Sequence, residues 1–297
     1  MENPIIDVGN RAFVLGGAYG NLQATQAILA KAKDLGFSSS QIIFTGDTVA
    51  YCGQPAETVA LLRDSGIHVI MGNCEESLGE DSDNCGCGFE EGTECNLLSV
   101  EWYRFCQNAL DTETKRWMSQ LPKSVIFQIG HFRLECLHGT PSAINEFVFP
   151  SDIENGRITP PENPDIDGYI TGHSGIPFVA GIEGKAWINS GAAGMPANDG
   201  TNRVWFATVE SANHGLIAET HPVSYDFKSA SHAMKKAGLN NGYRECLSSG
   251  IWPSHDVLPQ AEKLKTGIRQ QPERLVFEQN STDGLPGNTY PPEAIAS

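Results

Sequence analysis

Five short apolar runs, each followed by a small polar cluster that contains glycine, constrain the fold of this chain more than any other feature of its sequence. β-Branched and aromatic residues bounded by glycine are typical of buried strands. The runs with their clusters are residues 13–15 with 16–19, 42–44 with 46–47, 69–71 with 72–73, 134–137 with 138–139, and 169–170 with 172–173. Because ligands bind at the carboxyl ends of the strands in open α/β sheets, we expect these clusters to meet there.

Four side chains of these clusters form a ligand set suited to a divalent cation. Asp47 supplies a carboxylate, Asn73 an amide carbonyl, and His138 and His173 supply imidazoles. Two oxygen and two nitrogen donors suit manganese, iron, zinc or nickel. Each residue alone has an ordinary alternative, since an Asp after Gly is common in turns and a single His is often structural. Their occurrence at four successive strand ends favours a metal site.

These clusters resemble the motifs of the calcineurin-like metallophosphoesterases, most closely those of a small bacterial phosphodiesterase-like branch. The matching segments are residues 46–51, 72–75, 138–141, 172–175 and 189–194, and the resemblance runs from about residue 11 to about residue 240. It implies an α/β fold, a four-layer α/β/β/α sandwich of two mixed sheets. It also implies metal-dependent hydrolysis of a small phosphomonoester or phosphodiester.

Three metal ligands of that family are absent from this chain. The family opens with Asp-x-His-Gly-Asn, where residues 17–21 read Gly-Ala-Tyr-Gly-Asn, and closes with Gly-His-x-His, where residues 172–175 read Gly-His-Ser-Gly. In the family, the first of two ions takes the Asp and His of the opening motif and the last His of the closing motif, and both ions share one Asp. By position, the second ion keeps its full shell, whereas the first keeps only the shared Asp47. The resemblance therefore implies one intact metal site and one lost site.

Hydrolysis with a single ion is chemically feasible, because one ion can act as a Lewis acid and lower the pKa of bound water to about 7. In this scheme Asp47 holds the ion. Tyr19 occupies a lost ligand position, where its hydroxyl hydrogen-bonds a phosphoryl oxygen or the attacking water, or its ring fills the vacated space. Glu75 is the candidate proton donor, or alternatively a carboxylate favoured at a helix N-terminus by the macrodipole. These three residues form the predicted catalytic group.

The predicted substrate contacts come from the same clusters and comprise Gly17, Tyr19, Asn21, Cys74 and Ser174. The glycine pair at 16–17 lets the backbone approach a ligand closely, although it is also ordinary turn chemistry. Cys74 stands where many family members have a proton-donating His. A thiol with a pKa of about 8.5 is a poor general acid for this step.

Cysteines gather close to two of the clusters. Cys85 and Cys87 form a Cys-x-Cys, and Cys52 and Cys74 follow strand-end motifs. Three interpretations stay open: reduced thiols, ligands of a second and softer metal, and a redox-sensitive pair. Because the N-terminus lacks a basic signal-peptide region, we expect a cytoplasmic protein whose cysteines form no disulfide framework.

Charge and hydropathy restrict the partners. The chain has 36 acidic and 20 basic residues, a formal net charge of −16, which disfavours nucleic acid as a bulk ligand. A small phosphorylated molecule stays compatible, since a metal ion reverses the local field. No apolar run reaches the length of a membrane span, so we expect no membrane partner. The sequence is compatible with an oligomer as well as with a monomer.

The organisation follows the periodicity of the chain. We expect one metallophosphoesterase-like domain over residues 1–250, with a cysteine-containing loop and helical insertion at 79–121, and a C-terminal tail at 251–297 that is extended or partly disordered. Helices are predicted at 21–35, 55–64, 96–110 and 112–121, two short ones within 226–247, and hairpins at 124–137 and around 182–188. Two functions remain: a metal-dependent phosphoesterase, or an inactive relative that binds a metal and a phosphorylated ligand or a protein partner.

Overall fold

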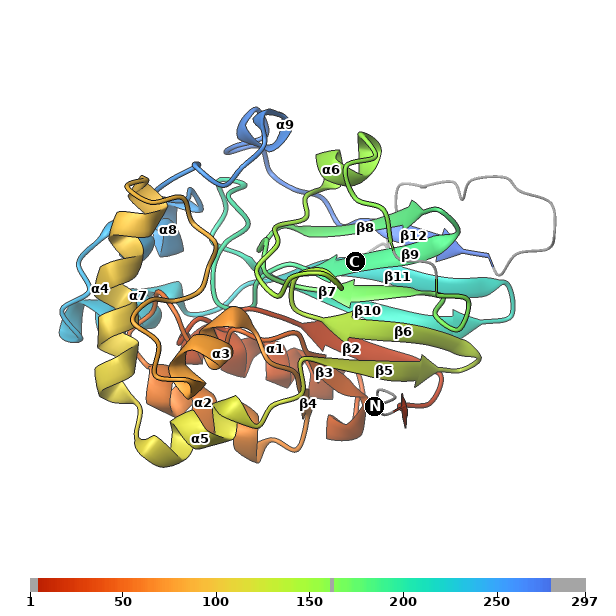
Figure 1. Ribbon diagram of the computed structural model, residues 1–297, viewed down its shortest axis with the longest axis horizontal. Coiled ribbons are helices and arrows are strands. Elements are labelled where there is room, and N and C mark those ends of the chain that lie inside the picture. Colours follow the sequence, from red (N-terminus) through yellow and green to blue (C-terminus); the bar gives the residue numbers. More distant parts are fainter. Residues whose placement is uncertain (1–4, 161–162, 279–297) are drawn as a thin grey trace.

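The computed structural model describes residues 5–160 and 163–278, and two six-stranded mixed sheets form its centre (Figure 1). The first sheet has the order β12-β11-β10-β2-β3-β4. Its three N-terminal strands are parallel neighbours, and the other three add in antiparallel fashion. The strands are β2 (Arg11–Leu15), β3 (Ile42–Phe44), β4 (His68–Val69), β10 (Val204–Ala212), β11 (Gly215–Val223) and β12 (Arg274–Phe277).

The second sheet has the order β1-β5-β6-β7-β9-β8. Three of its strands, β6, β7 and β9, are parallel neighbours, and antiparallel partners flank them on both sides. The strands are β1 (Ile5–Asp7), β5 (Ser124–Ile129), β6 (Phe132–Leu137), β7 (Gly168–Thr171), β8 (Pro177–Ile182) and β9 (Lys185–Ser190). The predicted α/β fold with two mixed sheets is confirmed.

Apolar side chains fill the space between the two sheets. Val14 and Ile43 from the first sheet join Phe127, Leu134 and Ile170 from the second in one buried cluster. Burial of several such side chains, each stabilising by about 1.5–3 kcal/mol, provides the main driving force that holds the sheets together. The sheets therefore place the ends of β3, β6 and β7 at fixed positions relative to one another.

Helices cover the outer face of the first sheet. α1 (Leu22–Asp34) begins after Asn21, whose side-chain oxygen accepts a hydrogen bond from the Ala24 amide. α2 (Pro55–Asp64) begins with a proline in its first turn. Both predicted helices are therefore confirmed. Ile28 and Leu62 of these helices are buried with Phe13 and other side chains of the first sheet.

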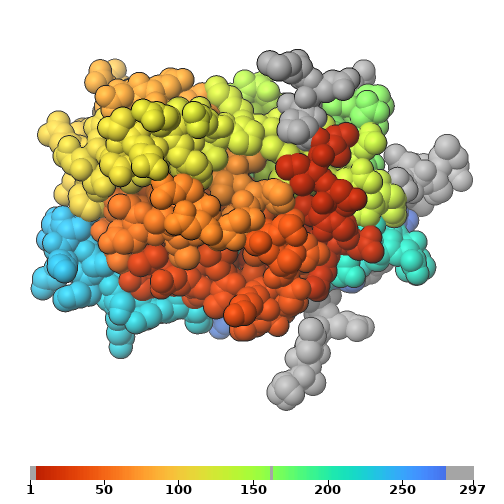
Figure 2. Space-filling model, turned by 90° about the horizontal axis from the view of Figure 1, so that it is seen from below, coloured from red at the N-terminus to blue at the C-terminus, as the bar shows by residue number. Residues whose placement is uncertain are grey.

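The remaining helices lie around one end of the sandwich or over its second sheet. α4, α7 and α8 lie together at one end of the sheets (Figure 1), and the N-terminal half of the chain, red to yellow, forms most of the face seen in Figure 2. α6 and its flanking segments contribute to the apolar cluster on the second sheet. These helices are α3 (Asn73–Gly79), α4 (Glu94–Ala109), α5 (Thr112–Ser119), α6 (Pro150–Glu154), α7 (Phe227–Lys236), α8 (Gly242–Ser249) and α9 (Gln260–Lys263). Among the residues with described positions, no helix is long and apolar enough to cross a membrane.

The C-terminal segment differs from the predicted tail that begins at residue 251. β12 pairs with β11 and closes one edge of the first sheet, and Leu275 is buried in the core between the sheets. The short helix α9 buries Glu262, which accepts hydrogen bonds from the backbone and hydroxyl of Ser151. Residues 251–278 therefore complete the domain, and the rest of the predicted tail, 279–297, lies outside the described residues.

Candidate metal centre

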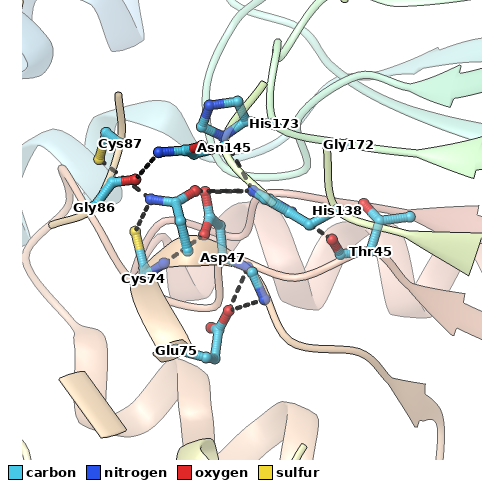
Figure 3. A network of polar contacts seen from close by, with 12 residues as sticks. Thr45, Asp47, Cys74, Glu75, Gly86, Cys87, His138, Asn145, Gly172 and His173 are labelled. Carbon is cyan, nitrogen blue, oxygen red and sulfur yellow. Dashed lines mark hydrogen bonds and ion pairs between the residues drawn. The ribbon is translucent and has the colours of Figure 1, made fainter. Parts of the chain in front are cut away.

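The structure brings the four predicted metal ligands together at one end of the sandwich. Asp47 follows β3 in the first sheet, and Asn73 is the first residue of α3. His138 follows β6, and His173 lies beyond the end of β7, both in the second sheet. Figure 3 shows the two histidines and Asp47 facing one another.

His138 lies at the centre of this group. Its Nε2 atom is 3.2 Å from Asp47 Oδ2 and 3.1 Å from Asn73 Oδ1. The same atom is 3.2 Å from His173 Nδ1. The candidate ligand atoms of Asp47, His138 and His173 all lie within 4.8 Å of one another. The spacing allows one cation to contact all of them. In the described part of the chain, no other group of three or more His, Cys, Asp or Glu residues has ligand atoms this close together.

Contacts outside this group orient its donor atoms inward. His138 Nδ1 is 2.6 Å from the carbonyl oxygen of Thr45, which can only accept, so Nδ1 carries the hydrogen and Nε2 faces the other ligands. The amide nitrogen of Asn73 donates to the Cys85 carbonyl oxygen at 2.9 Å, which turns the amide oxygen towards His138. Outer partners of this kind fix tautomer and orientation in metal sites. The donor set therefore fits a divalent cation.

Electrostatic interactions couple the ligands to one another. Burial opposes the charge of Asp47, but the charge and hydrogen bond of His138 outweigh it and lower the pKa of the carboxyl. Burial likewise opposes charge on His138, yet Asp47 outweighs it and raises the pKa of that imidazole. Burial and then the His138 charge lower the pKa of His173 to about 3. A proton and a metal ion therefore compete for His138 Nε2, because a histidine binds metal only when its ligating nitrogen is unprotonated.

Three of the six residues other than glycine that have positive φ angles in the described part of the chain lie at this site. Tyr19, Asp47 and His173 have φ angles of 53°, 63° and 59°, in the left-handed region that residues other than glycine seldom adopt. Each such residue costs about 1–3 kcal/mol and persists where the surrounding structure holds it, most often at functional sites. Three strained residues at predicted site positions therefore support a functional role for this region.

Residues 19–212 match the calcineurin-like phosphoesterase superfamily domain. The chain belongs to this superfamily. The match covers the segments that carry Asp47, Asn73, His138 and His173. The predicted family is therefore confirmed, and the remaining site residues belong to this metallophosphoesterase domain.

Individual relatives support the fold. An uncharacterized protein of Methanocaldococcus jannaschii is 26% identical over 259 residues, which are 80% of this chain and 97% of the relative. A metallophosphoesterase from Sphaerobacter thermophilus matches with a TM-score of 0.61 and 21% identity, over 82% of this chain and 99% of its own. A hypothetical protein from Pyrococcus horikoshii matches with a TM-score of 0.64 and 18% identity, over 81% and 98% of the two chains. At these identities the two solved structures establish the shared fold.

Glu75 holds the loop that carries Asp47 in place. Its buried carboxylate accepts hydrogen bonds from the amides of Gly72 and Asp47, each at 2.8 Å. It also accepts from the amide and hydroxyl of Thr48, each at 2.6 Å. Four donors occupy the carboxylate oxygens, so Glu75 acts as a positioning residue at the start of α3. The predicted role as proton donor is not supported by this geometry.

Tyr19 faces the pocket beside the metal centre. Its ring lies edge-on to Tyr51, with ring centroids 4.8 Å apart, and its hydroxyl has no hydrogen-bond partner among the residues described. Burial and then the charge of Asp47 raise the pKa of Tyr19 well above its usual value. The hydroxyl is therefore protonated and able to donate to a ligand.

The other predicted substrate contacts separate into two groups. Ser174 lines the pocket, and the Tyr19 ring folds back over Gly17, where an added Cβ would lie 2.5 Å from the ring. Asn21 instead caps α1, donates to the Gly194 carbonyl oxygen at 2.8 Å and lies outside the pocket lining, so this geometry does not support its predicted substrate contact. Cys74 has a buried thiol outside the pocket lining, and its amide donates to Asp47 Oδ1 at 3.1 Å, so it positions a ligand.

The cysteines do not add a metal site in the described part of the chain, where none joins the group of candidate ligands. Cys85 and Cys87 form a disulfide, which among the three interpretations fits a redox-sensitive pair and not reduced thiols. Gly86, with a φ of 62°, turns the chain so that the two side chains meet. Burial raises the pKa of the Cys52 and Cys74 thiols, which disfavours the thiolate form that binds metal.

Sequence reasoning missed most of the pocket next to His173. Phe147 lies on the His173 ring with centroids 4.1 Å apart, and Tyr243 and Trp252 approach from the C-terminal region. No local motif marks these residues, because they come from distant segments. The sequence analysis also did not predict that the Thr45 carbonyl oxygen contacts His138. The position of Thr45 between β3 and Asp47 was the available signal.

Proposed function

We propose that this metallophosphoesterase hydrolyses a small phosphoester with one divalent ion held by Asp47, Asn73, His138 and His173. The observation that carries the proposal is the convergence of these donors on His138 Nε2, with Thr45 and Cys85 holding two of them in the ligating orientation. Outer contacts of this kind commonly fix the orientation of metal ligands.

When bound, the ion would supply Lewis acidity and lower the pKa of a coordinated water. The chain contributes the positions of the ligands, which Glu75 and the loop around Cys85 maintain. Tyr19 contributes a protonated hydroxyl that donates a hydrogen bond to a phosphoryl oxygen, in the region where the family places its other ion. His173 forms one wall of the pocket, so a phosphoester bound there reaches the metal centre directly.

The ligand in this proposal is a small phosphorylated molecule, and the protein works in the cytoplasm. A net charge of −16 opposes binding to a nucleic-acid backbone. One ion is proposed because no second group of candidate ligands occurs in the residues that the structure describes.

A second candidate function is binding without catalysis. It is favoured by the loss of the opening motif, since Gly17 and Tyr19 replace ligands of the other ion. Such a protein would keep the ion and bind a phosphorylated ligand or a protein partner. The intact ligand set is retained in either case, so metal content alone does not separate the two functions.

The test combines elemental analysis with hydrolysis of bis(p-nitrophenyl) phosphate. We expect about one ion per chain with turnover in the native protein, and loss of both in Asp47→Ala. His131→Ala is the matched control, because His131 lies in the exposed turn between β5 and β6. Bound metal without turnover of any phosphoester tested would favour the second candidate, and a native protein that binds no divalent metal would refute both.

A further inference from the structure

The candidate metal ligands come from both halves of the sandwich. Two of them follow strands of the first sheet and two follow strands of the second, namely Asp47 and Asn73, and His138 and His173. A contact that joins the two halves at this site therefore affects how the ligands are placed. Asn145 makes such a contact, and Figure 3 shows its side chain reaching Gly86 beside the candidate ligands.

The side chain of Asn145 links the loop after β6 to the disulfide turn, residues 84–88, which lies between α3 and α4. Its Nδ2 atom donates a hydrogen bond to the Gly86 carbonyl oxygen at 2.9 Å. At Gly88, an added Cβ would lie 3.3 Å from Asn145 Nδ2 and 3.2 Å from the Asn145 carbonyl oxygen. The two segments are therefore packed directly against each other.

The loop that carries Asn145 is held by contacts of its own. The Thr140 hydroxyl donates to the Glu146 carboxylate at 2.6 Å. The Arg157 guanidinium donates to the Phe147 carbonyl oxygen at 2.7 Å. Because both neighbouring residues in this loop are anchored without help from the disulfide turn, Asn145 is the fixed partner in the contact.

The disulfide turn has less support. The segment between α3 and α4 contains no helix or strand, and Gly86 and Gly88 have φ angles of 62° and 75°. Asn145 and the candidate ligand Asn73 donate to adjacent carbonyl groups of this turn, at Gly86 and Cys85 respectively, each at 2.9 Å. Since the Cys85 carbonyl oxygen directs the Asn73 amide nitrogen, the position of the turn decides where the Asn73 amide oxygen points.

We propose that Asn145 is a positioning residue of the metal centre. By holding the disulfide turn, it keeps the Cys85 carbonyl group where that group orients Asn73. A residue that follows the second sheet thereby aligns a ligand that follows the first. The inference rests on the proposed function, since it concerns the ion that this function requires. Without the Asn145 contact, the fold should persist while the Asn73 amide loses its fixed orientation.

The test measures metal binding by Asn145→Ala. Isothermal titration calorimetry with Mn²⁺ should give an affinity about tenfold lower than that of the native protein, as for loss of an outer partner of a metal ligand. Tm should fall by no more than about 4 °C, because one hydrogen bond is lost. Asn108→Ala, at an exposed position of α4, is the matched control and should bind Mn²⁺ like the native protein.

A second background separates positioning from a general effect on structure. In Asn73→Asp the ligand is a carboxylate, which can bind metal through either oxygen and has no amide hydrogen to donate to Cys85. Its orientation no longer depends on the turn, so adding Asn145→Ala should lower the Mn²⁺ affinity less than about twofold. An equal loss in both backgrounds would overturn the inference. Native affinity in Asn145→Ala would also overturn it and leave the proposed function intact, whereas a native protein that binds no divalent metal would refute the proposed function itself.

Discussion

His138 Nδ1 lies 2.6 Å from the carbonyl oxygen of Thr45, and this contact decides which ring nitrogen faces the candidate metal centre. Because Nδ1 donates its hydrogen to Thr45, Nε2 is directed towards Asp47 and Asn73. Two sheets meet at this bond, since Thr45 follows β3 and His138 follows β6. Fold and ligand orientation are therefore set by the same contact.

The first prediction is that metal binding releases a proton from His138. Asp47 raises the pKa of His138 above its ordinary value of 6.5, so the metal-free imidazole is largely protonated at pH values below that raised pKa. Metal affinity should therefore fall as the pH decreases through this range. Calorimetry in two buffers with different ionisation enthalpies should report close to one proton released at pH 6. An affinity independent of pH between 5.5 and 8 would contradict the prediction.

The second prediction concerns Glu75. Glu75→Gln should lower the free energy of unfolding by about 2 kcal/mol or more, because an amide NH₂ would face backbone donors that the carboxylate now satisfies. Metal affinity should fall with it, since the strained backbone of Asp47 loses its support. Urea denaturation and metal titration measure the two effects.

Glu76→Gln is the control for this variant. Glu76 is adjacent in the chain, and its carboxylate forms an ion pair with Lys123 at the surface. Exposed pairs of this kind contribute about 0–1 kcal/mol, so the control should unfold almost like the native protein. If Glu75→Gln retained native stability and metal affinity but lost activity, the proton-donor role would be restored.

Local patterns predicted much of the fold. The predicted hairpin at 124–137 corresponds to β5 and β6, and the predicted helix at 55–64 corresponds to α2. In both cases short-range signals suffice, namely alternating apolar residues around a glycine turn and a proline in the first helical turn. The metal ligands could also be predicted from the sequence, because each one follows a predicted strand, either directly or after a glycine.

Features that depend on distant contacts were not predictable in this way. The role of Glu75 depends on the directions of three backbone amides, which no residue pattern encodes. Trp252 reaches the pocket from a segment whose composition suggested an extended tail. β12 was concealed for the same reason, since its four residues gain their stability from pairing with β11.

The third prediction is that reduction of the Cys85–Cys87 disulfide weakens metal binding. The Asn73 amide nitrogen is 2.9 Å from the Cys85 carbonyl oxygen and 3.3 Å from Cys87 Sγ, so the disulfide-closed turn orients this ligand. Loss of an outer-shell partner commonly lowers metal affinity about 10–100-fold. Metal titrations with and without a non-chelating phosphine reductant measure the effect.

The double variant Cys85→Ser and Cys87→Ser provides the matched control for reduction. It should bind metal as weakly as the reduced native protein, and its affinity should not respond to the reductant. Native affinity in both the reduced protein and the variant would show that the turn holds Asn73 without the disulfide. A higher metal content after reduction would instead support the alternative in which the two thiolates bind an ion.

The fourth prediction separates the two interpretations of Tyr19. Tyr19→Phe removes the hydroxyl and keeps the ring, which packs edge-on against Tyr51. If the hydroxyl stabilises charge on a phosphoryl oxygen, kcat/KM for bis(p-nitrophenyl) phosphate should fall about 100-fold, as for loss of one donor in an oxyanion-binding site. Metal content and Tm should stay at native values, because the hydroxyl bonds to no described protein group. Tyr51→Phe, which removes a hydroxyl from the adjacent ring, is the control and should change kcat/KM less than threefold. Native activity in Tyr19→Phe would mean that the ring alone fills the space of the lost ligand, so that hydrolysis would depend on the ion without help from this side chain.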